Sequence, residues 1–328
     1  MIKMSLDTGL STPGLEHMDS VQFRDGIPTV DDGLGFYISQ LAQLEAKIYE
    51  AKYTSINFMD LIPINTGVPE WADSWDYISY DAVTLGKFIG SSADDLPNVA
   101  LSANKTSVPI GYAGNMYDYS LDELRKTYQL RIPIDTAKAR AAFRGSQEHS
   151  QRVAYFGDAD RNMSGLFNNP NLALDNSVLD WSTATGQEIV DDMNSLMIKV
   201  WVDSANVHLP NVLVLDSNRF AQITSQRMDS GTDTTVFEFF LKNNIYTANT
   251  GQAPRVVPRL QLVGAGVGGV DRMMAYELND DNLGMVNPIP WRALAPQPKN
   301  LSIKIPCEYK ISGVEFRYPF SGAYRDHV

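Results

Sequence analysis

The segment from Asp135 to Asn168 constrains the fold of this chain more than any other. It reads DTAKARAAFRGSQEHSQRVAYFGDADRNMSGLFN, and small or apolar side chains recur in it at steps of three and four residues, the period of a helix. Asp135 is a favourable N-cap, and Gly157 can take the left-handed conformation that ends a helix. The spacing therefore predicts a helix over 135–157, roughly 30 Å long at 1.5 Å per residue, followed by a glycine-containing turn.

The apolar stripe of this helix is narrow and consists of small side chains. Arg140, Arg144 and Arg152 are interleaved with it. This pattern favours a helix that lies along a sheet or a neighbouring subunit over one that is sunk in a large core. An ordinary surface helix gives the same pattern, so the helix alone leaves both interpretations open.

Composition limits the classes of function. The chain has 328 residues, enough for one large domain or two. Its 27 Lys and Arg against 39 Asp and Glu give a net charge of −12, which disfavours tight binding of nucleic acid, because phosphate contacts depend on Lys and Arg. The single cysteine, Cys307, excludes an intrachain disulfide and a cysteine-based zinc site. No apolar run approaches the roughly 18 residues of a membrane span.

The segment 65–112 is rich in aromatic residues and is divided by glycine and proline into short strand-like stretches. Its aromatic residues include Trp71, Trp75, Tyr77, Tyr80 and Phe88. A two-stranded hairpin is marginally stable alone in water, and the segment has few aliphatic residues for a core of its own. We therefore expect its aromatic side chains to be covered by another surface. The alternative is a sheet edge packed on its own domain.

The remaining elements are segregated, which argues for an α+β fold. Residues 1–35 lack periodicity, and 36–53 form an amphipathic helix with Tyr37 and Leu41 on its apolar stripe, which docks on its own domain or on a neighbour. A capping box at Ser120 begins a short helix. The further predicted elements are a helix over 186–206, a buried strand over 209–215, a helix capped by Asp216 or Ser217, a helix over 235–243, strands near 256–263 and 271–278, and strand-like alternation over 302–320.

One motif suggests an enzyme. Gly264–Gly269 satisfies the G-x-G-x-x-G pattern of dinucleotide-binding sites and follows a strand-like run. A pyrophosphate site requires a helix after these glycines, but the segment 270–278 is short and ends in a turn cluster at 279–282. We therefore expect a flexible loop between strands, with a nicotinamide-dependent oxidoreductase as an alternative. The four histidines lie on separate elements without a nucleophile elbow. We predict no catalytic residues, metal or cofactor.

The order of these elements resembles the major capsid proteins of tailed bacteriophages, which share the Hong Kong 97-type fold with encapsulins. The resemblance rests on the long helix, the turn Gly165-Leu166-Phe167-Asn168, the run Leu61-Ile62-Pro63, and the segments 185–189 and 209–215. It covers most of the chain from about residue 36. Each motif alone has low specificity, and the resemblance rests on the order in which the motifs occur.

The resemblance implies an N-terminal arm over 1–64, an extended β-hairpin loop over 65–112 and an axial domain over 186–300. It implies a peripheral domain over 113–185 and 301–328, with the spine helix 135–157. Contacts between subunits would come from the loop aromatics Trp71, Trp75, Tyr77, Tyr80 and Phe88 and from Tyr37 and Leu41 of the arm. The resemblance also singles out Arg140, Arg144 and Arg152 on the spine helix, and Gly157, Gly165, Leu166 and Asn168 in the turn after it.

The implied function is a shell of pentamers and hexamers around double-stranded DNA, without sequence-specific contacts. The shell would belong to a virion assembled in the bacterial cytoplasm, with portal, scaffold or decoration proteins as further partners. An encapsulin-like compartment has the same fold and is the alternative.

Overall fold

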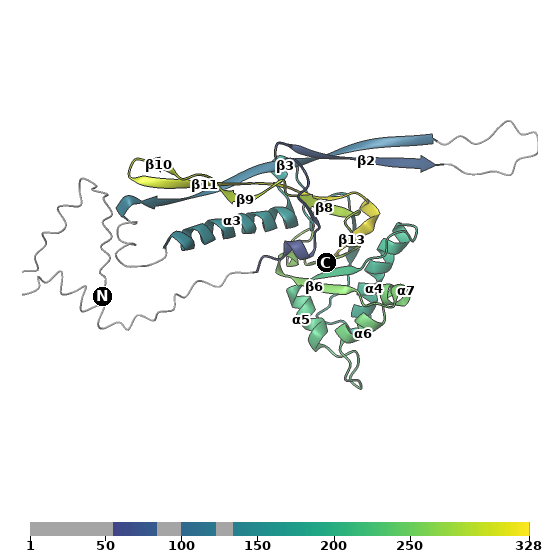
Figure 1. Ribbon diagram of the computed structural model, residues 1–328. Coiled ribbons are helices and arrows are strands. Elements are labelled where there is room, and N and C mark those ends of the chain that lie inside the picture. Colours follow the sequence, from purple (N-terminus) through teal and green to yellow (C-terminus); the bar gives the residue numbers. More distant parts are fainter. Residues whose placement is uncertain (1–54, 84–99, 123–133, 328) are drawn as a thin grey trace, which may run out of the picture. The chain divides into compact units, whose positions relative to one another are not determined.

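The computed structural model describes residues 55–83, 100–122 and 134–327 (Figure 1). Helices and strands both contribute, which confirms the predicted α+β class. Tyr37, Leu41, Phe88 and the helix predicted over 36–53 lie outside the described residues. Among the described helices, none combines the length and apolar character that crossing a membrane requires.

The longest strand, β3 (Ala100–Ser120), pairs with two different strands along its length. Its first half pairs antiparallel with β2 (Ser74–Val83), from Val83 opposite Ala100 to Ser74 opposite Pro109. Its second half pairs antiparallel with β11 (Ser302–Ser312), on the opposite side of β3. Two short strands, β9 (Ile289–Ala293) and β10 (Gln297–Lys299), pair with β11.

This double pairing leaves residues 74–83 and 100–109 as a ribbon only two strands wide, the β2–β3 ribbon (Figure 1). The predicted hairpin is present, but its predicted end at residue 112 falls in the middle of β3. Local sequence could not reveal this, because β3 continues against a partner strand almost 200 residues later. The helix predicted from Ser120 begins at Leu121, and its continuation lies outside the described residues.

The long helix α3 (Ile134–Phe156) confirms the central prediction and lies against β3 and β11. The Asn115 side chain donates to the carbonyl of Ala142, and the Tyr309 hydroxyl lies 2.8 Å from His149 Nδ1. The helix begins one residue earlier than predicted, so Asp135 lies inside its first turn instead of capping it. The narrow stripe of small side chains, buried at Ser146, Ser150 and Ala154, lets the helix approach the sheet closely.

Five strands form a second sheet in the order β4, β13, β7, β5, β6. Their bounds are β4 Ala173–Ser177, β5 Val212–Asp216, β6 Arg255–Arg259, β7 Arg272–Tyr276 and β13 Gly322–His327. Four helices accompany this sheet: α4 Gly186–Asp203, α5 Ser217–Ser225, α6 Val236–Lys242 and α7 Ile245–Thr250. All but α7, β4 and β13 were predicted, and Asp216 caps α5 as expected, accepting the backbone N–H groups of Asn218 and Arg219.

The two faces of this sheet contribute to two hydrophobic clusters. Leu213 and Leu215 of β5 pack with Met193 of α4 and Phe240 of α6. On the other face, Val212 and Val214 belong to a cluster that reaches the end of α3 and the turn after it. The sheet therefore joins α4 and α6 to the end of α3 through alternate residues of the same strands.

The strand β13 was not predicted, and it changes the predicted division of the chain. It pairs in parallel with β4 and antiparallel with β7, so residues 322–327 belong to the five-stranded sheet, although 301–328 were predicted to accompany the spine helix. Its sequence, GAYRDH, carries Arg, Asp and His within six residues and shows no apolar alternation. All six residues are nevertheless buried.

A third, small sheet contains β1 (Ile64–Asn65), β8 (Leu283–Val286) and β12 (Val314–Phe316). Short 3-10 turns complete the described structure: η1 Phe58–Asp60, η2 Ala159–Arg161, η3 Leu260–Leu262 and η4 Pro319–Ser321. The glycine segment 264–269 connects η3 to β7, as predicted for a loop. A strand follows these glycines where a dinucleotide site requires a helix, so the oxidoreductase hypothesis is wrong.

Candidate functional site

The turn after the spine helix, residues 157–169 (here the spine turn), closes the end of α3. The last carbonyls of a helix have no partner within the helix. Here four donors satisfy them: Gly157 N to Val153 O, Leu166 N to Ala154 O, Phe167 N to Tyr155 O, and Asn168 Nδ2 to Phe156 O, at 2.6–2.9 Å. The predicted residues Gly157, Leu166 and Asn168 therefore act together as a C-terminal cap.

Two glycines make this turn sterically feasible. Gly157 has φ +69°, and a Cβ there would lie 2.0 Å from the Met163 carbonyl oxygen. A Cβ on Gly165 would lie 2.4 Å from backbone atoms of Tyr155 and Phe156. Leu166 is fully buried beneath the turn. The spine turn is thus a folded end of the helix, and its backbone path requires glycine at positions 157 and 165.

The strand β13 connects this turn to the helix α4, and we call Tyr324–His327 with their partners the C-terminal clasp. Tyr324 and Asp326 face the spine turn. The Tyr324 hydroxyl donates to Leu166 O at 2.6 Å and accepts from Asn169 N at 3.0 Å. Asp326 accepts two hydrogen bonds from Arg272, at 2.6 and 2.8 Å, and Arg272 also donates to Phe167 O.

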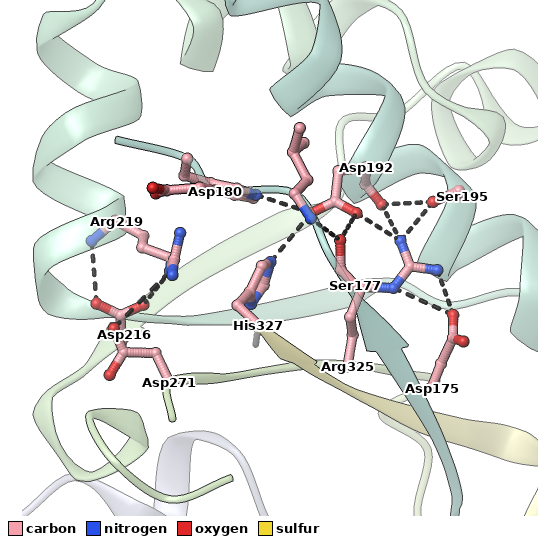
Figure 2. A network of polar contacts seen from close by, with 12 residues as sticks. Asp175, Ser177, Asp180, Asp192, Ser195, Asp216, Arg219, Asp271, Arg325 and His327 are labelled. Atoms are coloured by element: carbon pink, nitrogen blue, oxygen red, sulfur yellow. Dashed lines mark hydrogen bonds and ion pairs between the residues drawn. The ribbon is translucent and has the colours of Figure 1, made fainter. Parts of the chain in front are cut away.

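Arg325 and His327 face the opposite side, toward α4 (Figure 2). The Arg325 guanidinium donates to Asp192 Oδ1 at 2.9 Å and also pairs with Asp175. His327 Nε2 lies 3.0 Å from Asp192 Oδ2. That nitrogen must carry a proton, because the carboxylate can only accept.

Asp192 is the centre of this side of the clasp. Its carboxylate also accepts from Trp181 Nε1 at 2.8 Å and from the Ser177 hydroxyl at 3.1 Å. Burial alone would raise the pKa of Asp192, but the hydrogen bonds from His327 and Trp181 and the charge of Arg325 outweigh burial and hold it at about 2. The clasp is therefore a buried ionic network whose carboxylates have cationic partners.

The ribbon root consists of residues 72–77 with their partners Lys310, Glu315 and Arg317. Trp75 is half-buried and packs against the buried Ala72, Ile110 and Val286, with the Arg317 guanidinium 4.9 Å from the centre of its ring. Figure 1 shows β2 and β3 running on from this region as a pair. These contacts attach the ribbon to the small β1–β8–β12 sheet.

Two polar contacts complete the root. Lys310 donates to the Ala72 carbonyl at 3.2 Å and pairs with Asp73 at 3.1 Å. The Tyr77 hydroxyl donates to Glu315 Oε1 at 3.0 Å. Glu315 is buried, and it has no ion pair within the described part of the chain. Burial raises the pKa of Glu315, although Tyr77 and Arg317 partly oppose the shift.

The other predicted contact residues have different environments. Trp71 is 81% exposed, whereas Trp75 and Tyr77 contact their own chain at the root. Tyr80 lies on β2. On α3, Arg140 and Arg152 are exposed and Arg144 pairs with Glu148 at 2.8 Å. No group of three or more metal-ligating side chains was found in the ranges that the structure describes.

Comparison with known proteins identifies the family. A family model described as major capsid protein matches residues 86–328. The chain belongs to the major capsid protein family. It is thus a structural protein of a capsid and not an enzyme, and the match does not favour the encapsulin-like alternative. No curated protein matches the chain.

Solved structures show the same fold for this capsid protein. It is similar to the capsid of Myoviridae phage XM1, with a TM-score of 0.75 and 15% identity over 93% of this chain and 100% of that one. The capsid of a native GTA particle has a TM-score of 0.61 and 10% identity, over 92% of this chain and 100% of that one. A structure from Mycobacterium phage Ogopogo has a TM-score of 0.57 and 12% identity, over 92% of this chain and 100% of that one. The predicted Hong Kong 97-type fold is confirmed.

Sequence reasoning missed the C-terminal clasp and the partners of the ribbon root. A weak signal for the clasp existed, because Arg325, Asp326 and His327 are unusually polar for the end of a strand-rich segment. Their partners lie far away in sequence, at separations of 54 residues for Arg272 and 133 for Asp192. Only the folded chain brings these charges together.

Proposed function

We propose that this capsid protein assembles through pentamers and hexamers into an icosahedral shell around packaged double-stranded DNA. The observation that carries this proposal is the β2–β3 ribbon, a two-stranded element of ten paired positions on each strand. Such a ribbon is marginally stable alone in water. A neighbouring copy that covers it would stabilise the ribbon and join the subunits at the same time.

The side chains of the ribbon region support this role. Trp71 is 81% exposed just before β2, and Ile78 is 56% exposed within it. Large apolar side chains on a projecting element favour a protein partner. The same role is proposed for Tyr80 and, outside the described residues, for Phe88 and for the arm residues Tyr37 and Leu41.

The remaining predicted contacts fit a frame that carries this ribbon. The spine helix, with Arg140, Arg144 and Arg152, would contact adjacent copies along the shell wall. The helices α4–α7 and their sheet would meet their copies around the symmetry axes, with identical contacts repeated in closed rings. The spine turn, with Gly157, Gly165, Leu166 and Asn168, would hold the two parts in register.

The charge of the chain fits enclosure of DNA without tight binding. At −12, the subunit offers few uncompensated cations for phosphate contacts. The DNA would therefore be confined by the shell, without sequence-specific contacts. The proposal also includes portal, scaffold or decoration proteins as further partners, and assembly of the shell in the cytoplasm of the bacterial host.

The test is the particle formed when the protein is expressed, measured by sedimentation and negative-stain imaging. We expect closed shells or rings of five and six subunits, alone or with its scaffold. Trp71→Ser combined with Ile78→Ser should reduce assembly while leaving the subunit folded. Val178→Ser, which alters an apolar side chain 91% exposed outside the ribbon, is the control. Normal assembly of the double variant would contradict the role of the ribbon.

A further inference from the structure

The ribbon is attached to its own subunit by the continuation of β3 along β11 and by the root. Beyond Tyr77, the described polar contacts of the ribbon remain inside it: Ser79 bonds to the Asn104 carbonyl, and Lys105 pairs with Asp76. Ile78 is exposed. Besides the continuation of β3, the contacts of Trp75, Tyr77 and their partners therefore hold the ribbon against its subunit.

Glu315 is a buried carboxylate of this root that lacks an ion pair among the described residues. It lies on β12 with 8% of its surface exposed, yet the described residues offer its carboxylate one hydrogen bond, from the neutral hydroxyl of Tyr77. A buried carboxylate without an ion pair is destabilising, because water solvates the charge better than a single neutral donor does. Moving the ribbon away would expose this carboxylate to water.

The groups around Glu315 do not neutralise it. Tyr77 approaches from β2 and, in turn, interacts with Thr106 of β3. Arg317 follows Glu315 on the same segment, but its guanidinium lies over Trp75 and donates to the Asp280 carbonyl. Lys310 is engaged by Asp73. The nearest cations are thus committed elsewhere in the root.

A second phenol–carboxylate pair in the chain also includes an ion pair. The Tyr112 hydroxyl donates to Glu308 Oε2 at 2.5 Å, and Glu308 also pairs with Arg292 at 2.7 Å. The hydrogen bonds from Tyr112 and Arg292 lower the pKa of Glu308, whereas burial raises that of Glu315. The two pairs share their chemistry, and they differ in the presence of an ion pair and in burial, because Tyr112 is 55% exposed whereas Glu315 is buried.

We propose that Glu315 is a proton-sensitive positioning residue that sets how tightly the β2–β3 ribbon docks on its own subunit. With Glu315 neutral, the ribbon docks firmly; with Glu315 ionised, the root loosens and the ribbon can adjust to a neighbouring copy. This inference rests on the proposed contact between the ribbon and a neighbour for its role in assembly. The proposed effect of Glu315 on ribbon docking takes place within a single subunit and does not require assembly.

The direction of the pH dependence follows from linkage. A raised pKa means that the docked state binds the proton more readily than a state in which Glu315 is hydrated. Docking is therefore favoured as the pH falls through the raised pKa, and it weakens above that pH. An ordinary ion-paired carboxylate gives the opposite dependence.

The test is hydrogen exchange of unassembled subunits, followed by mass spectrometry across a pH series and corrected for intrinsic exchange rates. In the wild type, amides of 74–83 should exchange more slowly as the pH falls, while β13 amides serve as an internal control for folding. Glu315→Gln keeps an acceptor for Tyr77 but removes the charge. It should exchange several-fold more slowly at neutral pH and lose the pH dependence.

Glu308→Gln is the matched control and should behave like the wild type in the ribbon. Ribbon exchange in Glu315→Gln that equals the wild type at every pH would overturn the proposal. Tyr77→Phe removes the one hydrogen-bond donor that the described residues offer to Glu315, so the ribbon should exchange faster than in the wild type at neutral pH. Unchanged exchange would also count against the proposal. The proposed function is tested separately by assembly of the Trp71→Ser, Ile78→Ser variant, so either idea can fail alone.

Discussion

The C-terminal clasp and the ribbon root both bury carboxylates, but they support them in opposite ways. In the clasp, Asp192 and Asp326 each accept hydrogen bonds from an arginine, and their neighbours fill the remaining acceptor positions. In the root, the described residues give Glu315 a single donor, the phenol of Tyr77. The difference indicates a subunit with a rigid centre and an adjustable arm.

This contrast suits a shell protein. The clasp ties the spine turn to α4 through alternate residues of one strand, so both parts keep a fixed relation. The ribbon must instead fit neighbours in rings of different size, if the proposed pentamers and hexamers are correct. Small changes at its root would be amplified along the paired strands beyond it.

The largest expected effect comes from breaking the clasp. Arg272→Ala leaves Asp326 buried without its cation and frees the Phe167 carbonyl, so we expect a loss of about 3–5 kcal/mol in the free energy of unfolding. Urea denaturation of unassembled subunits measures this loss. Arg152→Ala, at an exposed helix position, should change it by less than about 0.5 kcal/mol. A loss below about 1 kcal/mol for Arg272→Ala would show that the clasp is not a rigid centre.

The next effect is steric. Gly165→Ala places a methyl group 2.4 Å from the backbone of Tyr155 and Phe156, so the spine turn must shift away from the helix end. Overpacking of this kind should destabilise the subunit by about 1–3 kcal/mol, measured by thermal or urea unfolding. Gly231→Ala is the control, because a methyl group there meets nothing within 4 Å. Equal stability of the two variants would contradict the cap described for α3.

A matched pair of hydroxyl deletions compares the two regions directly. Tyr324→Phe leaves Leu166 O and Asn169 N without their partner in a buried site, and should lower global stability by about 1–3 kcal/mol. Tyr77→Phe removes one bond at the root and should leave global stability within about 1 kcal/mol. Equal global losses would show that the root is as integral to the fold as the clasp.

The smallest effect requires only a change of pH. The pKa of Asp192 is lowered to about 2 from its usual 3.8, so its stabilising contribution is complete above 3.8 and is lost as the pH falls toward 2. The root should change in the opposite direction as Glu315 takes up its proton. Hydrogen exchange measured from neutral pH down to about 2 should therefore show the ribbon slowing before the β13 amides accelerate. Acceleration of both segments together would contradict the comparison.

The parts predicted from sequence are those specified locally. Helical period and Gly157 indicated α3 and its end, and the apolar run at 209–215 indicated a buried strand. The clasp was missed because its residues are charged and acquire their partners only on folding. The partner of Tyr77 lies 238 residues away, so the aromatic pattern predicted a covered surface without revealing that its own chain covers part of it.

The order of elements predicted more than any single motif. The glycine loop at 264–269 matches a nucleotide-binding pattern, yet three of its glycines serve positive-φ turns, at Gly264, Gly268 and Gly269. One of its amides, Val267 N, donates to Asp326 at 2.9 Å and so adds to the clasp. The short segment after the motif, which is a strand and not a helix, indicated correctly that these glycines form a loop.

The most direct test of a rigid centre with an arm completed by its neighbour is hydrogen exchange before and after assembly. We predict that amides of 74–83 and 100–109 exchange readily in unassembled subunits and become strongly protected in shells. The β13 amides should be protected in both states. Ribbon amides that are already as protected in the unassembled subunit as in the shell would contradict the account.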